Sequence, residues 1–222
     1  MPDQLLPDHS LIEEAEARAG SIIALRRAIH AEPELGLMTP KTSAKVRAAL
    51  AHLPLEWREG PSTSGMVAVL KGGAGAGRRV LLRGDMDALP MPEETGLDFA
   101  STIPGAMHAC GHDSHVAILM GVAEVLASMQ KDIAGTVKFI FQPAEEGRAG
   151  AKQMIDDGLF DKFPADCVFG MHNFPDIPVG HFAVKSGAMM ASSDSFEITI
   201  TGKATHAAIP HLGCDPILVA AQ

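Results

Sequence analysis

Apolar residues recur every three or four positions in several segments of this chain, the spacing that places them on one face of a helix. The first segment runs from Ser10, its expected N-cap, to His30, with glutamates in its first turn. The second opens at Thr39-Pro40, an N-cap followed by proline at the first helical position, and runs to about His52. The same spacing predicts two later helices, at residues 112–130 and 150–159.

Short runs of aliphatic and β-branched residues predict strands between these helices, at 66–70, 80–82, 136–141 and 167–171. The glycine-rich stretch KGGAGAG, residues 71–77, separates the first two runs and predicts a hairpin loop. It lacks the Lys-Ser/Thr ending of a phosphate-binding loop, so we expect no nucleotide there. Strands that alternate with helices indicate an α/β fold, with a mostly parallel sheet sandwiched between helices.

The pattern changes after Gly187. Residues 196–201 alternate between apolar and polar, which predicts a half-exposed strand, and Asp215-Pro216 predicts the start of a helix. We therefore place a domain boundary near Ser186. Residues 1–185 form the α/β domain in this interpretation, and residues 186–222 begin a smaller α+β domain that is too short to bury a core of its own.

Charge and composition narrow the classes of partner. The 27 acidic and 18 basic residues leave a formal net charge of −9, which argues against nucleic acid or an anionic membrane as the main partner and favours a small molecule. The first ten residues lack the features of a secretion signal, and no apolar run is long enough to span a bilayer. Three widely spaced cysteines are typical of reduced thiols. We expect a cytoplasmic protein.

The stretch MHACGHDSH, residues 107–115, holds one thiol, three imidazoles and a carboxylate within nine residues. Cysteine and histidine are preferred ligands of borderline transition ions, and the Cys-Gly-His spacing lets both side chains converge on one point. Other candidate metal-binding side chains directly follow predicted strands. In open α/β sheets, substrates and ions bind beyond the carboxyl ends of the strands. The sequence therefore predicts a metal site that also draws on Asp85, Asp87, Glu145, Glu146 and His172.

Each signal also has an ordinary structural explanation. The histidines of residues 107–115 could cap the following helix, Glu145-Glu146 could be a solvated pair, and His172 could be a core histidine. Asp85 and Asp87 could form a polar turn, or could orient a ligand histidine without touching the metal. A rival chemistry makes Cys110 a nucleophile with His112 or His115 as its base, but leaves the paired glutamates unexplained.

Six ordered motifs, taken together, resemble the bacterial hippurate hydrolases, the related N-acyl-amino-acid amidohydrolases and the plant hydrolases of auxin conjugates. They are RRAIHAEPELG at 26–36, RGDMDALP at 83–90, MHACGHDSH at 107–115, FQPAEEG at 141–147, GMHNFPDIPVG at 170–180 and GKATHAAIPH at 202–211. The resemblance covers nearly the whole chain. It implies a zinc-exopeptidase-like α/β catalytic domain, residues 1–185, followed by the beginning of a lid or dimerisation domain.

The resemblance also implies roles for individual residues. The metal ligands are Cys110, His112, Glu146 and His172, and they hold two divalent ions of manganese, zinc, cobalt or nickel. Glu145 is the general base, and His206, in the lid, helps to hold the carbonyl of the substrate. Asp85 and Asp87 are supporting residues.

The implied reaction is hydrolysis of the amide bond of N-acyl-L-amino acids to a carboxylic acid and a free amino acid, by a homodimer in the full-length form. Two departures accompany the resemblance. Ala204-Thr205 stand where the family usually has glycines, and family members are considerably longer. We therefore expect a truncated amino-terminal portion of such an enzyme. The alternative is a non-catalytic fragment that binds metal or another subunit.

Overall fold

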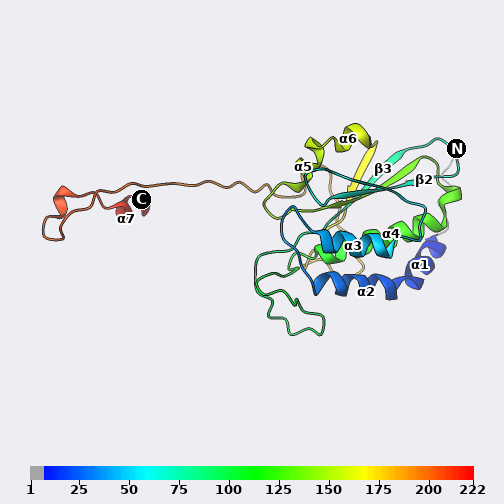
Figure 1. Ribbon diagram of the computed structural model, residues 1–222, viewed down its shortest axis with the longest axis horizontal. Helices are drawn as coiled ribbons and strands as arrows, with labels where there is room; N and C mark the ends of the chain where they lie inside the picture. The colour runs from blue at the N-terminus through cyan, green and yellow to red at the C-terminus, as the bar shows by residue number, and fades with distance from the viewer. Residues whose placement is uncertain (1–7) are drawn as a thin grey trace. The chain divides into compact units, whose positions relative to one another are not determined.

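The computed structural model describes residues 8–222 (Figure 1). The chain divides into two compact units between Phe174 and Pro175, ahead of the boundary predicted near Ser186. The roles assigned to the two parts, a catalytic domain and a lid or dimerisation domain, remain predictions.

The first unit contains a five-stranded sheet with the order β1-β2-β4-β3-β5. Its strands are β1 (Glu56–Glu59), β2 (Met66–Lys71), β3 (Arg79–Asp85), β4 (Thr136–Gln142) and β5 (Cys167–Gly170). β3 pairs in parallel with both β4 and β5, whereas β2 pairs antiparallel with both β1 and β4. The predicted α/β class is confirmed. The sheet is mixed, and its parallel part consists of the three strands that lead into the candidate ligands.

The predicted hairpin at residues 71–77 is wrong. β2 and β3 do not pair with each other, because β4 lies between them and pairs with both. The glycines instead let the loop pass close to the end of η1 (Gln130–Asp132) and the residues after it. A Cβ atom on Gly72 would lie 2.0 Å from the carbonyl oxygen of Ile133, and one on Gly77 would lie 2.5 Å from the carbonyl carbon of Ala134.

Two groups of helices lie on opposite sides of the sheet (Figure 1). The first group is α1 (Asp8–Ala17), α2 (Ala19–His30), α3 (Pro40–Ala49) and α4 (His112–Ser128), and the second is α5 (Gly150–Asp156) and α6 (Leu159–Lys162). The helix predicted from Ser10 to His30 is divided at Arg18, whose backbone N–H bonds to the carbonyl of Ala15 at 3.1 Å. Ser10 lies within α1 and is not its N-cap.

The alternation of side chains along β2 and β4 produces two cores. Phe139 and Phe141 of β4 are fully buried against Ile29 of α2 and Val116 of α4. Ile140, between these two residues, faces the other way and packs with Met154 of α5 and Leu159 of α6. β4 is buried on both faces between these two cores, and the candidate ligands follow the carboxyl ends of β4 and of the strands parallel to it.

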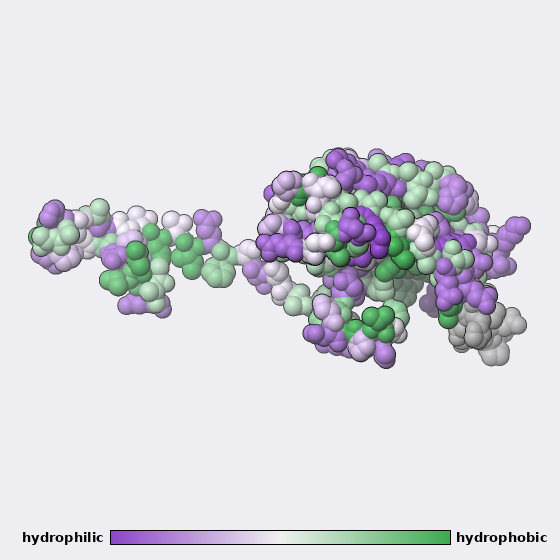
Figure 2. Space-filling view, turned by 90° about the horizontal axis from the view of Figure 1, so that it is seen from below, coloured by the Kyte–Doolittle hydropathy of each residue, from purple (hydrophilic) through white to green (hydrophobic). Residues whose placement is uncertain are grey.

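The second unit has little regular structure. It contains η2 (Pro210–Leu212), α7 (Pro216–Ala220), which starts at the predicted Asp215-Pro216 with Asp215 as its N-cap, and an isolated bridge between Lys203 and Cys214. The strand predicted at residues 196–201 is wrong, because no strand within residues 175–222 is available to share its hydrogen bonds. Apolar, green surface runs along much of this unit in Figure 2, and its exposed apolar side chains include Phe182, Val184, Phe196 and Ile198.

Within residues 8–222, no helix combines the length and the apolar character that crossing a membrane requires.

Candidate metal centre

Four segments deliver the candidate ligands to one edge of the sheet. β3 ends at Asp85, which lies opposite Gln142, the last residue of β4, in the parallel register. Glu145 and Glu146 follow β4, His172 follows β5, and α4 begins at His112 directly after Cys110-Gly111. The parallel strands therefore aim their carboxyl ends at the first turn of α4, as expected for a ligand site in an open α/β sheet.

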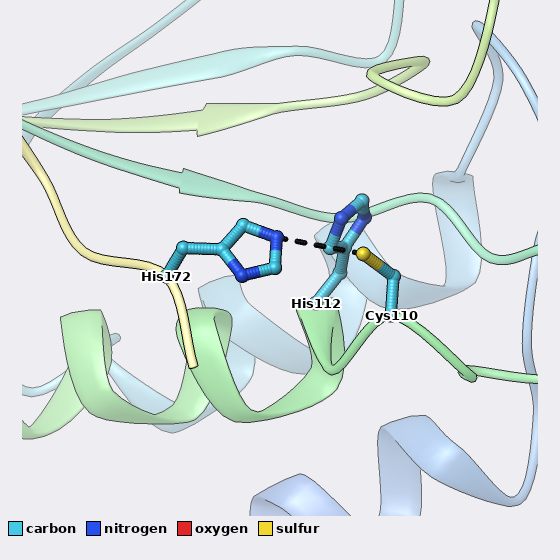
Figure 3. Close-up of side chains that lie close together, drawn as sticks. All are labelled: Cys110, His112 and His172. Carbon is cyan, nitrogen blue, oxygen red and sulfur yellow. Dashed lines mark hydrogen bonds between the residues drawn. The ribbon is translucent and has the colours of Figure 1, made fainter. Parts of the chain in front are cut away.

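Cys110 and His172 point toward each other across this edge (Figure 3). The Sγ atom of Cys110 lies 3.4 Å from Nε2 of His172, and Nδ1 of His172 lies 2.7 Å from the carbonyl oxygen of Asn173. Since a carbonyl oxygen only accepts, Nδ1 carries the proton and Nε2 presents its lone pair. Gly111 makes this approach possible, because its φ is +87° and a Cβ there would lie 2.3 Å from the Asn173 side chain.

His112 is fully buried, and its ring is oriented in the same way. Its Nδ1 donates to the carbonyl oxygen of Asp87 at 2.8 Å, so the lone pair belongs to Nε2. That nitrogen is buried without a hydrogen-bond partner among the described residues. It faces carboxylate oxygens of Asp85 at 3.5 Å and of Glu145 and Glu146 at 3.9 Å each. The lone pair of this buried nitrogen and the carboxylates around it can together bind a cation.

Asp87 links the histidine to the paired glutamates. Its buried carboxylate accepts the backbone N–H of Glu145 at 2.8 Å and that of Glu146 at 3.0 Å. Ala144, directly before them, has a left-handed backbone with φ of +55°, a conformation that persists only where the surroundings enforce it. Asp87 therefore fixes the backbone of the loop that carries both glutamates, and its supporting role in a metal site remains a prediction.

The pKa values reflect the concentration of negative charge. Burial, followed by the charge of Glu146, raises the pKa of the Cys110 thiol to about 12. Burial acts against protonation of His112, but its hydrogen bond to Asp87 and the charges of Asp85 and Asp87 outweigh burial and raise the pKa of His112. Without a cation, Cys110 holds its proton near neutral pH, and the carboxylates around His112 favour its protonated form more than water would. The same negative field stabilises a divalent ion in place of those protons.

The donor atoms form overlapping groups whose members lie within 4.8 Å of one another. One group is Cys110, His112 and His172, the second is His112, Glu145 and Glu146, and the third is Asp85, His112 and His115. The first two contain all four predicted ligands and the predicted base. Sulfur, nitrogen and oxygen donors at these distances fit a divalent transition ion. The assignment of each residue as ligand or base remains a prediction, because Glu145 and Glu146 lie equally far from His112.

A comparison with models of protein families matches residues 81–221, more than half of the chain, to peptidase family M20/M25/M40. The chain belongs to this family. An N-acetylcysteine deacetylase of Bacillus subtilis is 45% identical over 202 residues, which are 90% of this chain and 52% of that protein. The hippurate hydrolase of Campylobacter jejuni is 44% identical over 211 residues, 95% of this chain and 54% of that protein. This M20 chain spans about half the length of the curated relatives it matches.

Two solved structures, one of them described as an M20 peptidase, have the same fold. A dinuclear metal binding peptidase of the M20 family from Bacillus subtilis matches with a TM-score of 0.69 and 42% identity, covering 74% of this chain and 46% of the other. A structure from methicillin-resistant Staphylococcus aureus matches with a TM-score of 0.78 and 30% identity, covering 97% of this chain and 57% of the other. The resemblance drawn from the six motifs is thereby confirmed.

The remaining predicted site residue of this M20 chain, His206, belongs to the second unit. Its side chain is exposed, and its Nδ1 accepts the backbone N–H of Ala208 at 3.2 Å. This bond holds the histidine ring against its own loop. Because Nδ1 is the acceptor, the proton of the neutral ring is on Nε2, which can donate it. Its role toward a substrate remains a prediction.

Sequence reasoning assigned no role in the metal site to Arg83 or Asn173. Arg83 pairs with Asp85 at 2.6 Å, and Asn173 contacts both Cys110 and His115. Both residues stand inside the quoted motifs: Arg83 is two residues before Asp85, and Asn173 directly follows His172. Adjacency to a candidate ligand was the only signal that could have identified them.

The geometry weakens the thiol-nucleophile hypothesis. Cys110 is paired with His172, not with His112 or His115 as that hypothesis requires. A thiol whose pKa is raised to about 12 holds little thiolate near neutral pH, whereas nucleophilic cysteines have a lowered pKa.

Proposed function

We propose that this M20 chain carries the metal-binding part of an amidohydrolase that cleaves the amide bond of N-acyl-L-amino acids, releasing a carboxylic acid and a free amino acid. The observation that carries the proposal is the convergence of Cys110, His112 and His172 with the Glu145-Glu146 pair at one edge of the sheet. The printed names of relatives support the substrate class, since they include deacetylases of N-acetylcysteine, a hippurate hydrolase and hydrolases of IAA-amino acids.

Two divalent ions are the cofactors in this proposal, in keeping with the dinuclear metal described for the Bacillus subtilis structure. Cys110, His112, Glu146 and His172 would hold them. The mixed donor set suits manganese, zinc, cobalt or nickel. When bound, such ions lower the pKa of a water from 15.7 to roughly 7 and polarise the carbonyl of the amide.

The residues of this chain then have distinct tasks. Glu145, whose side chain is 44% exposed, takes a proton from the attacking water and passes it to the departing amine nitrogen. Asp87 holds the backbone N–H groups of Glu145 and Glu146, so the base and the ligand carboxylate keep a fixed separation. His206 donates to the oxyanion that develops on the substrate carbonyl, a contribution worth ~2.7–4 kcal/mol for comparable donors.

In the full-length form we propose a cytoplasmic homodimer. The three cysteines, all free, are in keeping with a reducing compartment. The exposed apolar side chains of the second unit, which include Phe196 and Ile198, are in keeping with a surface covered by further protein.

The test compares Glu145→Ala with Glu146→Ala in a full-length version of the protein. Glycine release from hippurate is measured with manganese, cobalt or zinc present, and bound metal is measured by mass spectrometry. Loss of the base should lower turnover by 10²–10⁴-fold while metal content stays unchanged, and Glu146→Ala should lose metal. Glu94→Ala, which alters an exposed glutamate outside the donor groups, is the matched control.

Each alternative predicts a different result. Metal loss in Glu145→Ala but not in Glu146→Ala exchanges the roles of the two glutamates. Metal content without hydrolysis in the wild-type protein favours the non-catalytic fragment. Hydrolysis that survives a chelator but stops on alkylation of Cys110 favours the thiol nucleophile.

A further inference from the structure

His115 lies among the candidate ligands but differs from them in its hydrogen bonds. It follows His112 by three residues on α4, so both side chains lie on the same face of the helix. Its ring centroid is 4.5 Å from that of His172 and 5.6 Å from that of His112. Only 2% of its side chain is exposed. His115 therefore packs against both candidate histidine ligands.

Both ring nitrogens of His115 are already occupied. Nδ1 lies 2.6 Å from Oδ1 of Asp85, and Nε2 accepts the backbone N–H of Asn173 at 3.1 Å. Since Nε2 is an acceptor, the proton of the neutral ring is on Nδ1, where the Asp85 carboxylate receives it. A metal ligand needs a free lone pair, and His115 has none to offer. The grouping of Asp85, His112 and His115 within 4.8 Å is therefore not a third set of ligands.

Asn173 receives support from His115 on one side and orients His172 on the other. Its backbone N–H is held by His115, its carbonyl oxygen accepts from Nδ1 of His172, and its side-chain amide donates to the carbonyl of Cys110 at 3.4 Å. The position of Asn173 thus determines which way the lone pair of His172 points. An error there would turn His172 away from Cys110.

Asp85 is in turn held in place by the sheet. Its carboxylate pairs with Arg83 at 2.6 Å, and Nε of Arg83 donates to the side chain of Gln142 at 2.9 Å. These contacts form a series that connects three elements. It starts at Gln142 at the end of β4, passes through Arg83 and Asp85 at the end of β3, and reaches His115 in the first turn of α4. It leads to Asn173, beyond the end of β5, so it braces the four segments that form the site.

We propose that His115 is a positioning residue: Asp85 fixes its tautomer, and its Nε2 anchors the backbone of Asn173 so that His172 faces Cys110 and His112. The inference depends on the proposed metal centre and adds a residue that touches no metal. Partners of metal ligands that act in this way typically contribute 10–100-fold to metal affinity.

The first measurement uses the wild-type chain with ¹⁵N-labelled histidine and ¹¹³Cd²⁺ as the probe. Ring nitrogens of His112 and His172 should show coupling to cadmium, and those of His115 should show none while its Nδ1–H signal persists. Coupling at His115 would overturn the inference, since it would make this residue a ligand. No coupling at His112 and His172 would refute the metal centre itself.

The second measurement is the affinity for Cd²⁺ in competition with a chelator. His115→Phe keeps a ring but removes both nitrogens, and should bind 10–100-fold more weakly than wild type. His115→Gln keeps a carbonyl oxygen that can accept from Asn173, and should recover part of the loss. The matched control is His108→Phe, because His108 is equally buried and neither of its ring nitrogens has a hydrogen-bond partner among the described residues.

Equal affinities in His115→Phe and His108→Phe, with cadmium still coupled to His112 and His172, would refute only the positioning role. A loss in His115→Gln as large as in His115→Phe would also count against it, since the acceptor for Asn173 would then be irrelevant. The wild-type spectra keep the inference falsifiable even where His115→Phe does not fold.

Discussion

Replacing Asp87 with asparagine tests whether one buried carboxylate organises the loop of the two glutamates. The two oxygens of Asp87 accept the backbone N–H groups of Glu145 and Glu146 at 2.8 and 3.0 Å. Asparagine has nearly the same shape but only one oxygen. In either orientation of the amide, one of the two N–H groups loses its acceptor and faces another donor.

The expected loss of stability follows from that single orphaned donor. A buried donor left without its acceptor costs ~1–3 kcal/mol, out of a total of ~5–15 kcal/mol for a typical domain. In a protein of this size, the melting temperature should fall by roughly 2–12 °C. Urea unfolding of the metal-free protein, followed by the fluorescence of Trp57, measures the change. Trp57 is the single tryptophan and lies 6.1 Å from the ring of Phe141 in the core.

Asp166→Asn is the matched control. Asp166 also accepts a backbone N–H, that of Arg79 at 2.8 Å, and pairs with the Arg79 guanidinium. Its side chain is 39% exposed, so water replaces much of what is lost and the change should stay within ~1 kcal/mol. Equal shifts of the urea midpoint in the two variants would refute the argument.

The pH dependence gives a second check on Asp87. Burial acts to raise the pKa of this carboxyl, but the neighbouring His112 and the two backbone N–H groups that the carboxylate accepts outweigh burial and hold the pKa below the ordinary value of 3.8. A carboxyl with a lowered pKa stabilises the fold above its ordinary pKa and loses that contribution as the pH falls through the lowered value. The difference in stability between wild type and Asp87→Asn should therefore narrow in acid below about pH 4.

Three further predictions concern the core, the loop after β4 and the thiol. Phe139→Ala should lower the free energy of unfolding by ~3–5 kcal/mol in the same urea titration, because Phe139 is fully buried; a loss below 1 kcal/mol would contradict this packing. Gly150→Ala should destabilise the protein and reduce metal affinity, because its Cβ would lie 1.8 Å from the carbonyl oxygen of Pro143. In metal-free protein at neutral pH, Cys110 should be alkylated far more slowly than the exposed Cys214, since burial and neighbouring carboxylates raise its pKa to about 12; mass spectrometry of the labelled peptides distinguishes the two rates.

Local signals predicted the elements that depend on neighbouring residues. The Thr39-Pro40 pair marked the start of α3, Asp215-Pro216 marked that of α7, and apolar spacing located α4 and β4. The same local signals did not predict which strands pair with each other. The loop at residues 71–77 has the composition of a hairpin turn, yet β4, which lies much later in the chain, is inserted between the two strands it joins.

The sequence by itself determined which donors are present: the Cys110-Gly-His112 spacing, the Glu145-Glu146 pair and His172 are side chains of the types that bind divalent transition ions. Only the tertiary structure decided which of them face one another and which side chains hold them. Asp87 reaches the backbone of Glu145 across 58 positions of sequence, and His115 reaches that of Asn173 across another 58. Side-chain types and local spacing are properties of neighbouring residues. The direction of a ligand's lone pair is instead set by hydrogen bonds between distant segments, and these bonds exist only after the sheet and α4 have packed together.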